Sequence, residues 1–181
     1  MRSDWANPEQ MEHILAAMMP DNRLVMRVCM ATALRVSDAL NLRTDKLRQR
    51  MTVRELKTGK NRRIYLPIEL YHALVANAGK IWVFESRTDA TKHRTRQAVY
   101  KDVKRAAAVF QRTGALNRKQ NVTTHTGRKV AAVDEYHRTG SMTAAAKLLN
   151  HSSEAVTALY ALADALTDKK IGGGKRGKKC R

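Results

Sequence analysis

Apolar residues recur at helical spacing in the first part of the chain. In residues 7–20 (NPEQMEHILAAMMP) they stand three or four positions apart, the repeat of one face of an α-helix. Asn7 suits the N-cap, Pro8 suits the first helical position, and Pro20 ends the pattern. Residues 21–33 are too apolar to be exposed on every side. The pattern therefore predicts two consecutive helices.

The repeat changes after residue 50. Residues 51–56 (MTVREL) and 62–67 (RRIYLP) are short and rich in strand-favouring residues, and the intervening KTGKN carries a turn glycine. This arrangement predicts a β-hairpin, or part of a small three-stranded sheet. Residues 81–86 (IWVFES) are the expected third strand.

The rest of the chain returns to helical patterns. We expect helices over residues 37–42, over 68–79 with Gly79 closing the helix, and over 91–111, a very basic segment. Residues 123–166 predict three short helices with two tight breaks. The fold class is thus mostly α with a small antiparallel β-sheet, as one domain over 1–168 and a basic, flexible tail over 169–181.

Charge narrows the choice of partners. The chain has 35 Lys and Arg against 16 acids, a net charge of +19, and a pI near 10.5. Such an excess favours a polyanion, with nucleic acid first and an anionic membrane surface second. We see no run of about 18 apolar residues and no signal peptide. The two cysteines, Cys29 and Cys180, suggest no disulfide framework and no zinc site, so we expect a reducing cytoplasm.

Several polar residues stand in places that call for an explanation. Arg35 follows a strongly apolar helix, where an unpaired charge is costly, so either Asp38 neutralises it or it faces a ligand. Lys57 starts the turn of the hairpin. His125 and Arg128 share a helix face. Taken singly, each of these has an ordinary structural explanation, as do His151 in the break NHSS and Tyr160 in ALYAL.

In order, however, these residues form a pattern. ALRVSDALNL, LKTGKNRRIYLP, HTGR, LLNHSS and ALY resemble the tyrosine recombinase (phage integrase) family in both order and spacing, over residues 8 to 164. The family's order is Arg, Lys, His-x-x-Arg, His or Trp, and Tyr. The resemblance implies the tyrosine recombinase catalytic-domain fold. The corresponding catalytic residues are Arg35, Lys57, His125, Arg128, His151 and Tyr160.

Some features depart from the family. Gly127 and Lys129 stand where the family usually has leucine and often histidine, and Asn150 replaces a glycine. Gly127 would loosen its helix by about 1 kcal/mol relative to alanine. Most members also carry a separate amino-terminal DNA-binding domain. Either a longer protein was trimmed, or the chain resembles the short inversion recombinases that have only the catalytic domain.

The resemblance also implies how the scissile phosphate is held. Guanidinium groups give paired hydrogen bonds to the equatorial oxygens, on which negative charge develops. Arg35 and Arg128 are therefore assigned to that phosphate as electrostatic stabilisers. His151 would hydrogen-bond a phosphate oxygen. Asp38 would orient the site from behind.

Proton transfer completes the implied chemistry. Tyr160 would be the nucleophile, and because a phenol titrates near about 10 it needs a base or a positive field. His125 is the candidate to take that proton. The 5′ oxygen of deoxyribose needs an acid, for which Lys57 is the candidate and Lys60 the reserve. The product would be a covalent 3′-phosphotyrosine and a free 5′ hydroxyl.

The resemblance then implies site-specific recombination of double-stranded DNA: integration, excision or inversion, through a Holliday junction in a homotetramer. DNA-bending accessory proteins are possible partners, and no cofactor or metal is required. We expect phosphate contacts from further basic residues. They are Lys60, Arg62, Lys92, Arg94, Arg96, Lys101, Lys104, Arg105 and Lys129. The tail could bind DNA or a neighbouring subunit.

Two other functions remain open. Residues 140–162 also suit a helix-turn-helix of a non-catalytic DNA-binding protein, although that leaves Arg35, Lys57 and His125 unexplained. A type IB topoisomerase-like relaxing enzyme would use a similar residue set. GGGKRGKK near the carboxyl end is not a P-loop, because Lys179 stands in the place of the hydroxyl residue and no strand precedes it.

Overall fold

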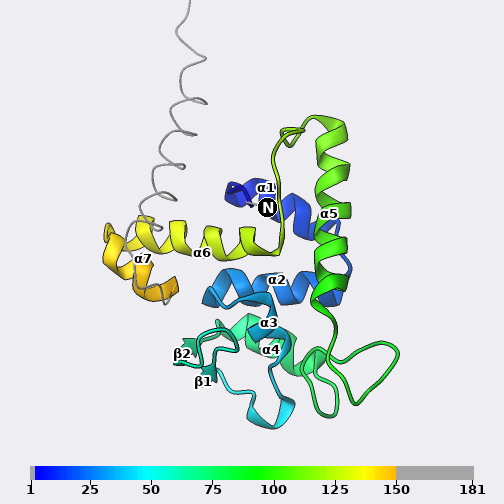
Figure 1. Cartoon of the computed structure of the whole chain (residues 1–181), viewed down its shortest axis with the longest axis vertical. Coiled ribbons are helices and arrows are strands. Elements are labelled where there is room, and N and C mark those ends of the chain that lie inside the picture. The colour runs from blue at the N-terminus through cyan, green and yellow to red at the C-terminus, as the bar shows by residue number, and fades with distance from the viewer. Residues whose placement is uncertain (1–2, 150–181) are drawn as a thin grey trace, which may run out of the picture. The chain divides into compact units, whose positions relative to one another are not determined.

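The structure is a computed structural model, and it describes residues 3–149 of the 181-residue chain (Figure 1). Contacts divide the chain into two compact units, Met1–Ala131 and Ala132–Arg181. The boundary proposed at residue 168 lies outside the described residues. Within residues 3–149, no helix is long and apolar enough to cross a membrane. The elements are α1 (Pro8–Ala16), α2 (Pro20–Thr32), α3 (Val36–Leu40), the 3-10 turn η1 (Thr44–Lys46), β1 (Arg50–Arg54), β2 (Asn61–Tyr65), α4 (Ile68–Asn77), α5 (Arg96–Thr113), α6 (Thr124–Thr139) and α7 (Met142–Leu149).

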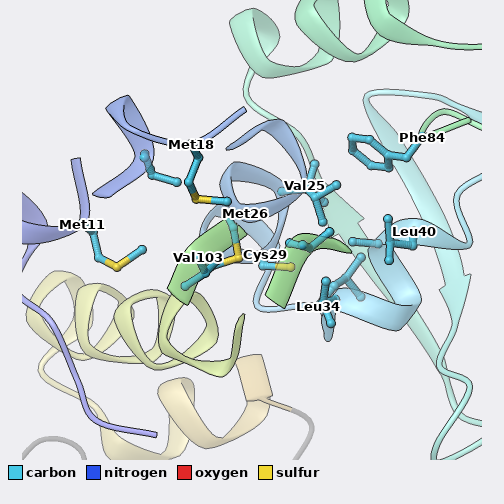
Figure 2. Packing of buried hydrophobic residues seen from close by; sticks show 14 of the residues in the cluster. Met11, Met18, Val25, Met26, Cys29, Leu34, Leu40, Phe84 and Val103 are labelled. Atoms are coloured by element: carbon cyan, nitrogen blue, oxygen red, sulfur yellow. The ribbon is translucent and has the colours of Figure 1, made fainter. Parts of the chain in front are cut away.

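Helix α2 is central to the first unit, because it contacts α1, α3, α4 and α5. Its inner residues Val25, Met26 and Cys29 are fully buried. Figure 2 shows them packed among side chains from the other elements, including Leu40 of α3 and Val103 of α5. This burial explains why the sequence of α2 is apolar on more than one side.

The first helix begins at Pro8, as predicted, but it ends at Ala16, and Pro20, which was expected to end it, is instead the first residue of the second helix. The Asn7 side chain accepts a hydrogen bond from the Gln10 backbone at 2.7 Å, and the Gln10 side chain accepts one from the Asn7 backbone at 3.2 Å. This reciprocal pair caps α1. Helix α2 begins at Pro20, and Asp102 of α5 accepts from the Met19 backbone at 2.8 Å. A carboxylate at this helix N-terminus is favourable, so α5 fixes the start of α2.

The predicted hairpin forms, but the third strand does not. Strands β1 and β2 pair antiparallel, with Arg50 opposite Tyr65 and Arg54 opposite Asn61. Residues 81–86 make only isolated bridges, Arg43 with Trp82 and Glu85 with His93. Val83 and Phe84 are buried, so this apolar run belongs to a looped segment of the core. The expectation of a third strand was wrong, because burial alone does not produce a continuous ladder.

The limits of the next helices also differ from the prediction, beginning with α3, which spans Val36–Leu40 where residues 37–42 were expected. Helix α4 ends at Asn77, and Gly79 lies beyond it, where an added Cβ would collide with the Glu85 side chain. Gly79 therefore serves a close approach and does not close the helix. Helix α5 starts at Arg96 because the Thr95 side chain accepts from the Ala98 backbone at 3.1 Å. Residues 91–95 belong to the preceding loop.

The second unit is described as far as Leu149. It contains the end of α6 and the whole of α7, and its buried side chains are small or aliphatic, such as Val133, Ala145 and Leu149. Gly140 has φ +65° and donates its N–H to the Tyr136 carbonyl at 2.7 Å, which ends α6. The Ser141 side chain then accepts from the Ala144 backbone at 3.2 Å and starts α7. This is the first of the two breaks predicted in the last three helices.

Candidate active site

Arg35 lies between α2 and α3 and is the N-cap residue of α3. Its side chain is 18% exposed, and its Nη1 donates to Glu55 Oε2 at 2.8 Å. Asp38 lies farther away, with Oδ2 at 4.0 Å from the same nitrogen. Within the described part of the chain, no hydrogen bond is recorded for the remaining Arg35 donors. Arg35 is therefore both paired, as one sequence interpretation required, and able to present further donors to a ligand.

Glu55 was not among the sequence candidates, yet it connects several elements of the site. It is fully buried at the end of β1, and besides Arg35 it accepts from Arg62 Nη1 at 3.4 Å and from Thr58 Oγ1 at 2.9 Å. One signal could have found it. Met51 and Val53 alternate on one face of β1, and Glu55, the first residue after the strand, continues that alternation. An acid in an apolar face needs cationic partners.

The carboxyl end of α2 holds two more guanidinium groups. Ala33 is left-handed, with φ 53°, so α2 stops there. Arg62 donates to the Thr32 carbonyl and, at 3.3 Å, to the Ala33 carbonyl. Arg128 of α6 donates to the same Ala33 carbonyl at 2.6 Å. The last carbonyls of a helix carry partial negative charge and lack helical partners, which makes them good acceptors for arginine.

These contacts concentrate positive charge. Burial, and then the charges of Arg35 and Arg62, lower the pKa of Arg128 to about 10, while Glu55 and Asp38 oppose that change. Burial, with a smaller contribution from the charge of Arg35, also lowers the pKa of Arg62, while the hydrogen bond and charge of Glu55 oppose that change. Guanidinium groups that repel one another in this way are stabilised by a bound anion. The arrangement is therefore suited to hold a phosphate.

His125 lies one helical turn before Arg128 in the first turn of α6, and it is exposed although Thr124 and Thr126 beside it are buried. Partial desolvation lowers the pKa of His125 from 6.5, and the nearby charges of Arg128, Arg96 and Arg35 lower it further. The imidazole is consequently neutral at pH 7. A neutral imidazole can accept a proton from a hydroxyl group.

The Lys57 turn is fixed to this site from both sides. Asp38 Oδ1 accepts from the Leu56 backbone at 2.9 Å. Gly59 has φ +67° and donates to the Glu55 carbonyl at 2.8 Å. Lys57 itself is exposed. Asp38 thus supports the turn more closely than it supports Arg35, for which it was proposed.

The close packing of α6 against α2 explains why residue 127 is a glycine. A Cβ at this position would lie 3.0 Å from Met26 Cε and 3.3 Å from Met30 Cγ, so the glycine lets α6 approach α2 closely. This approach brings Arg128 within reach of the Ala33 carbonyl. The sequence-based interpretation considered only the lower helix propensity of glycine.

The basic residues expected to contact DNA separate into two groups. Exposed or half-buried are Lys60, Lys92, Arg96, Lys101, Lys104 and Arg105. Arg62, Arg94 and Lys129 are 8%, 9% and 9% exposed, and their partners are internal. Arg94 contacts Asp21 and Asn22, and Lys129 donates to the Ser3 carbonyl. The polar ends of these three side chains therefore bind the protein itself.

The outer face of the hairpin is a basic surface that the sequence candidates left out. Arg50, Arg54 and Arg63 are exposed on it, together with Thr52 and Tyr65. Arg50 stacks over the Tyr65 ring at 5.6 Å. Among residues 3–149, no ion pair involves these three arginines. Strand alternation could have revealed this face, because all three stand at outward positions.

Not every predicted catalytic residue can be placed. The structure brings Arg35, Arg128 and His125 into one electrostatic neighbourhood and ties the Lys57 turn to Arg35. His151, Tyr160 and Asn150 lie outside the described residues. A groove of about 590 Å³ between α2 and α4, lined by Arg23, Leu24 and Ala73 among others, contains none of the predicted catalytic residues.

Comparison with known proteins gives one family and a consistent fold. Residues 4–166 match the model described as the phage integrase family. A lambda integrase dimer bound to a COC′ core site gives a TM-score of 0.71 at 19% identity, covering 100% of this chain and 64% of that one. XerH site-specific recombinase bound to a palindromic difH substrate gives a TM-score of 0.69 at 19% identity, covering 94% of this chain and 52% of that one. The catalytic domain of bacteriophage HP1 integrase gives 0.62 at 19%, covering 96% of both chains.

The chain thus spans about half to two thirds of the XerH and lambda integrase chains. At these identities the likeness concerns the fold, and it confirms the fold expected from the sequence. No curated protein sequence matches the chain.

Proposed function

Because the chain belongs to the phage integrase family, we propose that it is a site-specific DNA recombinase that cuts and rejoins strands through a covalent 3′-phosphotyrosine. Integration, excision and inversion all use this chemistry. We propose that the enzyme acts on double-stranded DNA in the cytoplasm of a bacterium or phage-infected cell, and that it needs no cofactor.

One observation carries this proposal. Arg35 and Arg128 come from segments far apart in the sequence, and the charge of Arg35 is close enough to lower the pKa of Arg128. Each guanidinium also has a fixed anchor, Glu55 for Arg35 and the Ala33 carbonyl for Arg128. Two anchored guanidinium groups can hold the oxygens of one phosphodiester and stabilise the charge that develops during attack.

The remaining roles follow the sequence motif. Tyr160 attacks the phosphorus and loses its proton to neutral His125. Lys57 protonates the departing 5′ oxygen, with Lys60 as the alternative donor, and His151 donates to a phosphate oxygen. The low pKa of His125 supports its part, because the base is already unprotonated at pH 7.

The DNA partner is supported by the charge of the exposed surfaces. Arg96 lies near enough to lower the pKa of His125, so α5 begins beside the proposed phosphate site. Lys101 and Arg105 continue along the same helix, although Arg105 is paired with Asp102 at 2.6 Å. We propose that these residues and Lys60, Lys92 and Lys104 follow the DNA backbone.

The assembly is proposed by analogy. One solved relative is a lambda integrase tetramer bound to a Holliday junction, at 19% identity. We propose a homotetramer on DNA for this chain too, with DNA-bending accessory proteins as further partners. A helix-turn-helix protein without catalysis is less well supported, because it gives no role to the anchored Arg35. A topoisomerase-like enzyme differs from a recombinase in that it would not require synapsis of two sites.

A covalent trap tests the proposal. The target site is first selected from random duplexes by binding to the protein, and is then prepared with a nick beside the cleavage position so that the cut end diffuses away. Wild type should give a protein–DNA complex that survives denaturation. Tyr160→Phe should bind the same duplex in a gel shift and give no such complex.

Two results would reject the proposal. If wild type binds the selected duplex and never becomes trapped, the protein is a binding module. If it relaxes a supercoiled plasmid with a single site as fast as it recombines two sites, the result supports the topoisomerase-like function.

A further inference from the structure

We propose that Glu55 is a positioning residue for the proton donor: its buried carboxylate fixes the Lys57 turn relative to Arg35. The acid and the phosphate-binding guanidinium then meet the same phosphodiester. This inference rests on the proposed function and adds to it a residue that the family motif does not include.

The geometry joins the two groups through one oxygen. Glu55 Oε2 accepts from Arg35 Nη1 at 2.8 Å and from Thr58 Oγ1 at 2.9 Å. Thr58 directly follows Lys57. The backbone of Glu55 also closes the turn, since its N–H donates to the Lys60 carbonyl at 3.0 Å and its carbonyl accepts from Gly59 at 2.8 Å. The carboxylate thus connects the turn to the start of α3.

The burial of Glu55 needs an explanation beyond folding. The position is fully buried and continues the inward face that Met51 and Val53 begin. An apolar side chain there would serve the core without the desolvation of a charge, and replacing buried ion pairs by apolar residues is often neutral or stabilising. Arg62 helps to neutralise the carboxylate at 3.4 Å. The charge is therefore retained at a cost, which fits a role in the site.

The step that this geometry would serve is the departure of the 5′ oxygen. The Tyr160 oxygen forms a bond to phosphorus while its proton goes to His125. The bond from phosphorus to the 5′ oxygen breaks, and Lys57 Nζ gives a proton to that oxygen, which leaves as a hydroxyl. Glu55 touches none of the reacting atoms and acts only through Lys57 and Arg35.

A pair of substrates can separate these effects. One duplex has the normal 5′ oxygen at the cleavage position, and the other has a bridging 5′ sulfur. A thiol titrates near about 8.5, so a thiolate leaves without being protonated, whereas an alkoxide does not. The rate of covalent complex formation is measured on both duplexes for wild type, Lys57→Ala, Arg35→Ala, Glu55→Gln and Thr58→Val. Thr58 is exposed, so Thr58→Val removes one bond to Glu55 without touching the core.

We expect Glu55→Gln and Thr58→Val to slow cleavage of the oxygen duplex by about 10-fold to 100-fold, below the full loss of a general acid. The sulfur duplex should restore Thr58→Val to nearly the wild-type rate, as it should restore Lys57→Ala. It should restore Glu55→Gln in part, because that variant also removes the ionic partner of Arg35. Arg35→Ala should remain slow on both duplexes, because phosphate binding is still needed.

Three other results would overturn the inference. The sulfur duplex could restore the rate of covalent complex formation for Lys57→Ala but not for Glu55→Gln or Thr58→Val. In that case Glu55 does not act through the proton donor, and the proposed function stands. If sulfur fails to restore Lys57→Ala, the assignment of the acid falls, and the role of Glu55 falls with it. If wild type gives no covalent complex on either duplex, the proposed function itself is wrong.

Discussion

The two faces of the β1–β2 hairpin use the same kind of side chain in opposite ways. Arg62 points inward, is 8% exposed, and donates to Glu55 and to the last carbonyls of α2. Arg63, the next residue, points outward beside Thr52 and is exposed. A single step along a strand therefore changes a cation from part of the interior into part of the molecular surface.

The difference shows why a count of basic residues is a poor guide to a nucleic-acid interface. On the inner face, a guanidinium is held by acceptors of the protein and helps to shape the site. On the outer face, Arg50, Arg54 and Arg63 have no acidic partner among the described residues, so a polyanion can bind them. The net charge of +19 contains both kinds.

The largest contrast should be in stability. Arg62→Ala leaves the buried Glu55 with one cation fewer and removes the arginine donor of the Thr32 carbonyl, while Arg128 still donates to the Ala33 carbonyl. The free energy of unfolding should therefore fall by about 3 kcal/mol. Arg63→Ala should change it by less than about 0.5 kcal/mol. Denaturant unfolding of both variants measures the difference. Equal losses would mean that the two faces are not distinct.

A second test concerns the close approach that positions Arg128. Gly127→Leu introduces the residue that the family usually has, but the new side chain must displace Met26 and Met30. Overpacking should lower the free energy of unfolding by about 2 kcal/mol. Gln97→Leu, at an exposed position of α5, is the matched control and should be nearly neutral. A Gly127→Leu protein as stable as wild type would show that α6 does not need this approach.

A third test addresses the outer face alone. If Arg54 and Arg63 each contact a phosphate, each alanine substitution should reduce the slope of log binding constant against log salt by about 0.9. The double variant should lose about twice as much. Arg27→Ala is a suitable control, because Arg27 is already paired with Glu12 at 2.7 Å. An unchanged slope in the double variant would remove the outer face from the DNA interface.

The smallest expected effect is a shift in pH dependence. The pKa of His125 lies below 6.5, so the base stays unprotonated until the pH falls below that value. The acidic limb of covalent complex formation should therefore lie below pH 6.5. Arg96→Gln removes one positive charge, so the pKa of His125 should rise and the limb should move to higher pH. A limb that stays in place or moves to lower pH would contradict this role of Arg96.

Much of the fold and part of the candidate site could be predicted from local sequence. Asn7 and Pro8 marked the start of α1, the KTGK segment marked the hairpin turn, and the order of motifs pointed to Arg35 and Arg128. These signals are local, or are a matter of order along the chain. The isolated bridges of residues 81–86 were missed because an apolar run does not distinguish a strand from a buried loop.

The rest depended on three-dimensional neighbours. Arg94 and Lys129 look like surface cations in the sequence. In the structure Arg94 donates to Asp21 and Lys129 donates to the Ser3 carbonyl, so both are buried. Glu55 carries no motif. Strand alternation could have marked it as an inward-facing acid, but its contact with Arg35 depends on the fold. Burial of a charged group is decided by partners that lie far away in the sequence.

The central claim is that the site forms a bond between Tyr160 and a DNA phosphate. The most direct measurement is mass spectrometry of the trapped complex after digestion with a protease and a nuclease. We predict a peptide containing Tyr160 that carries a nucleotide through its 3′ phosphate, and a free 5′ hydroxyl on the released strand. An adduct on a different residue, or a 5′-phosphate linkage, would contradict the claim.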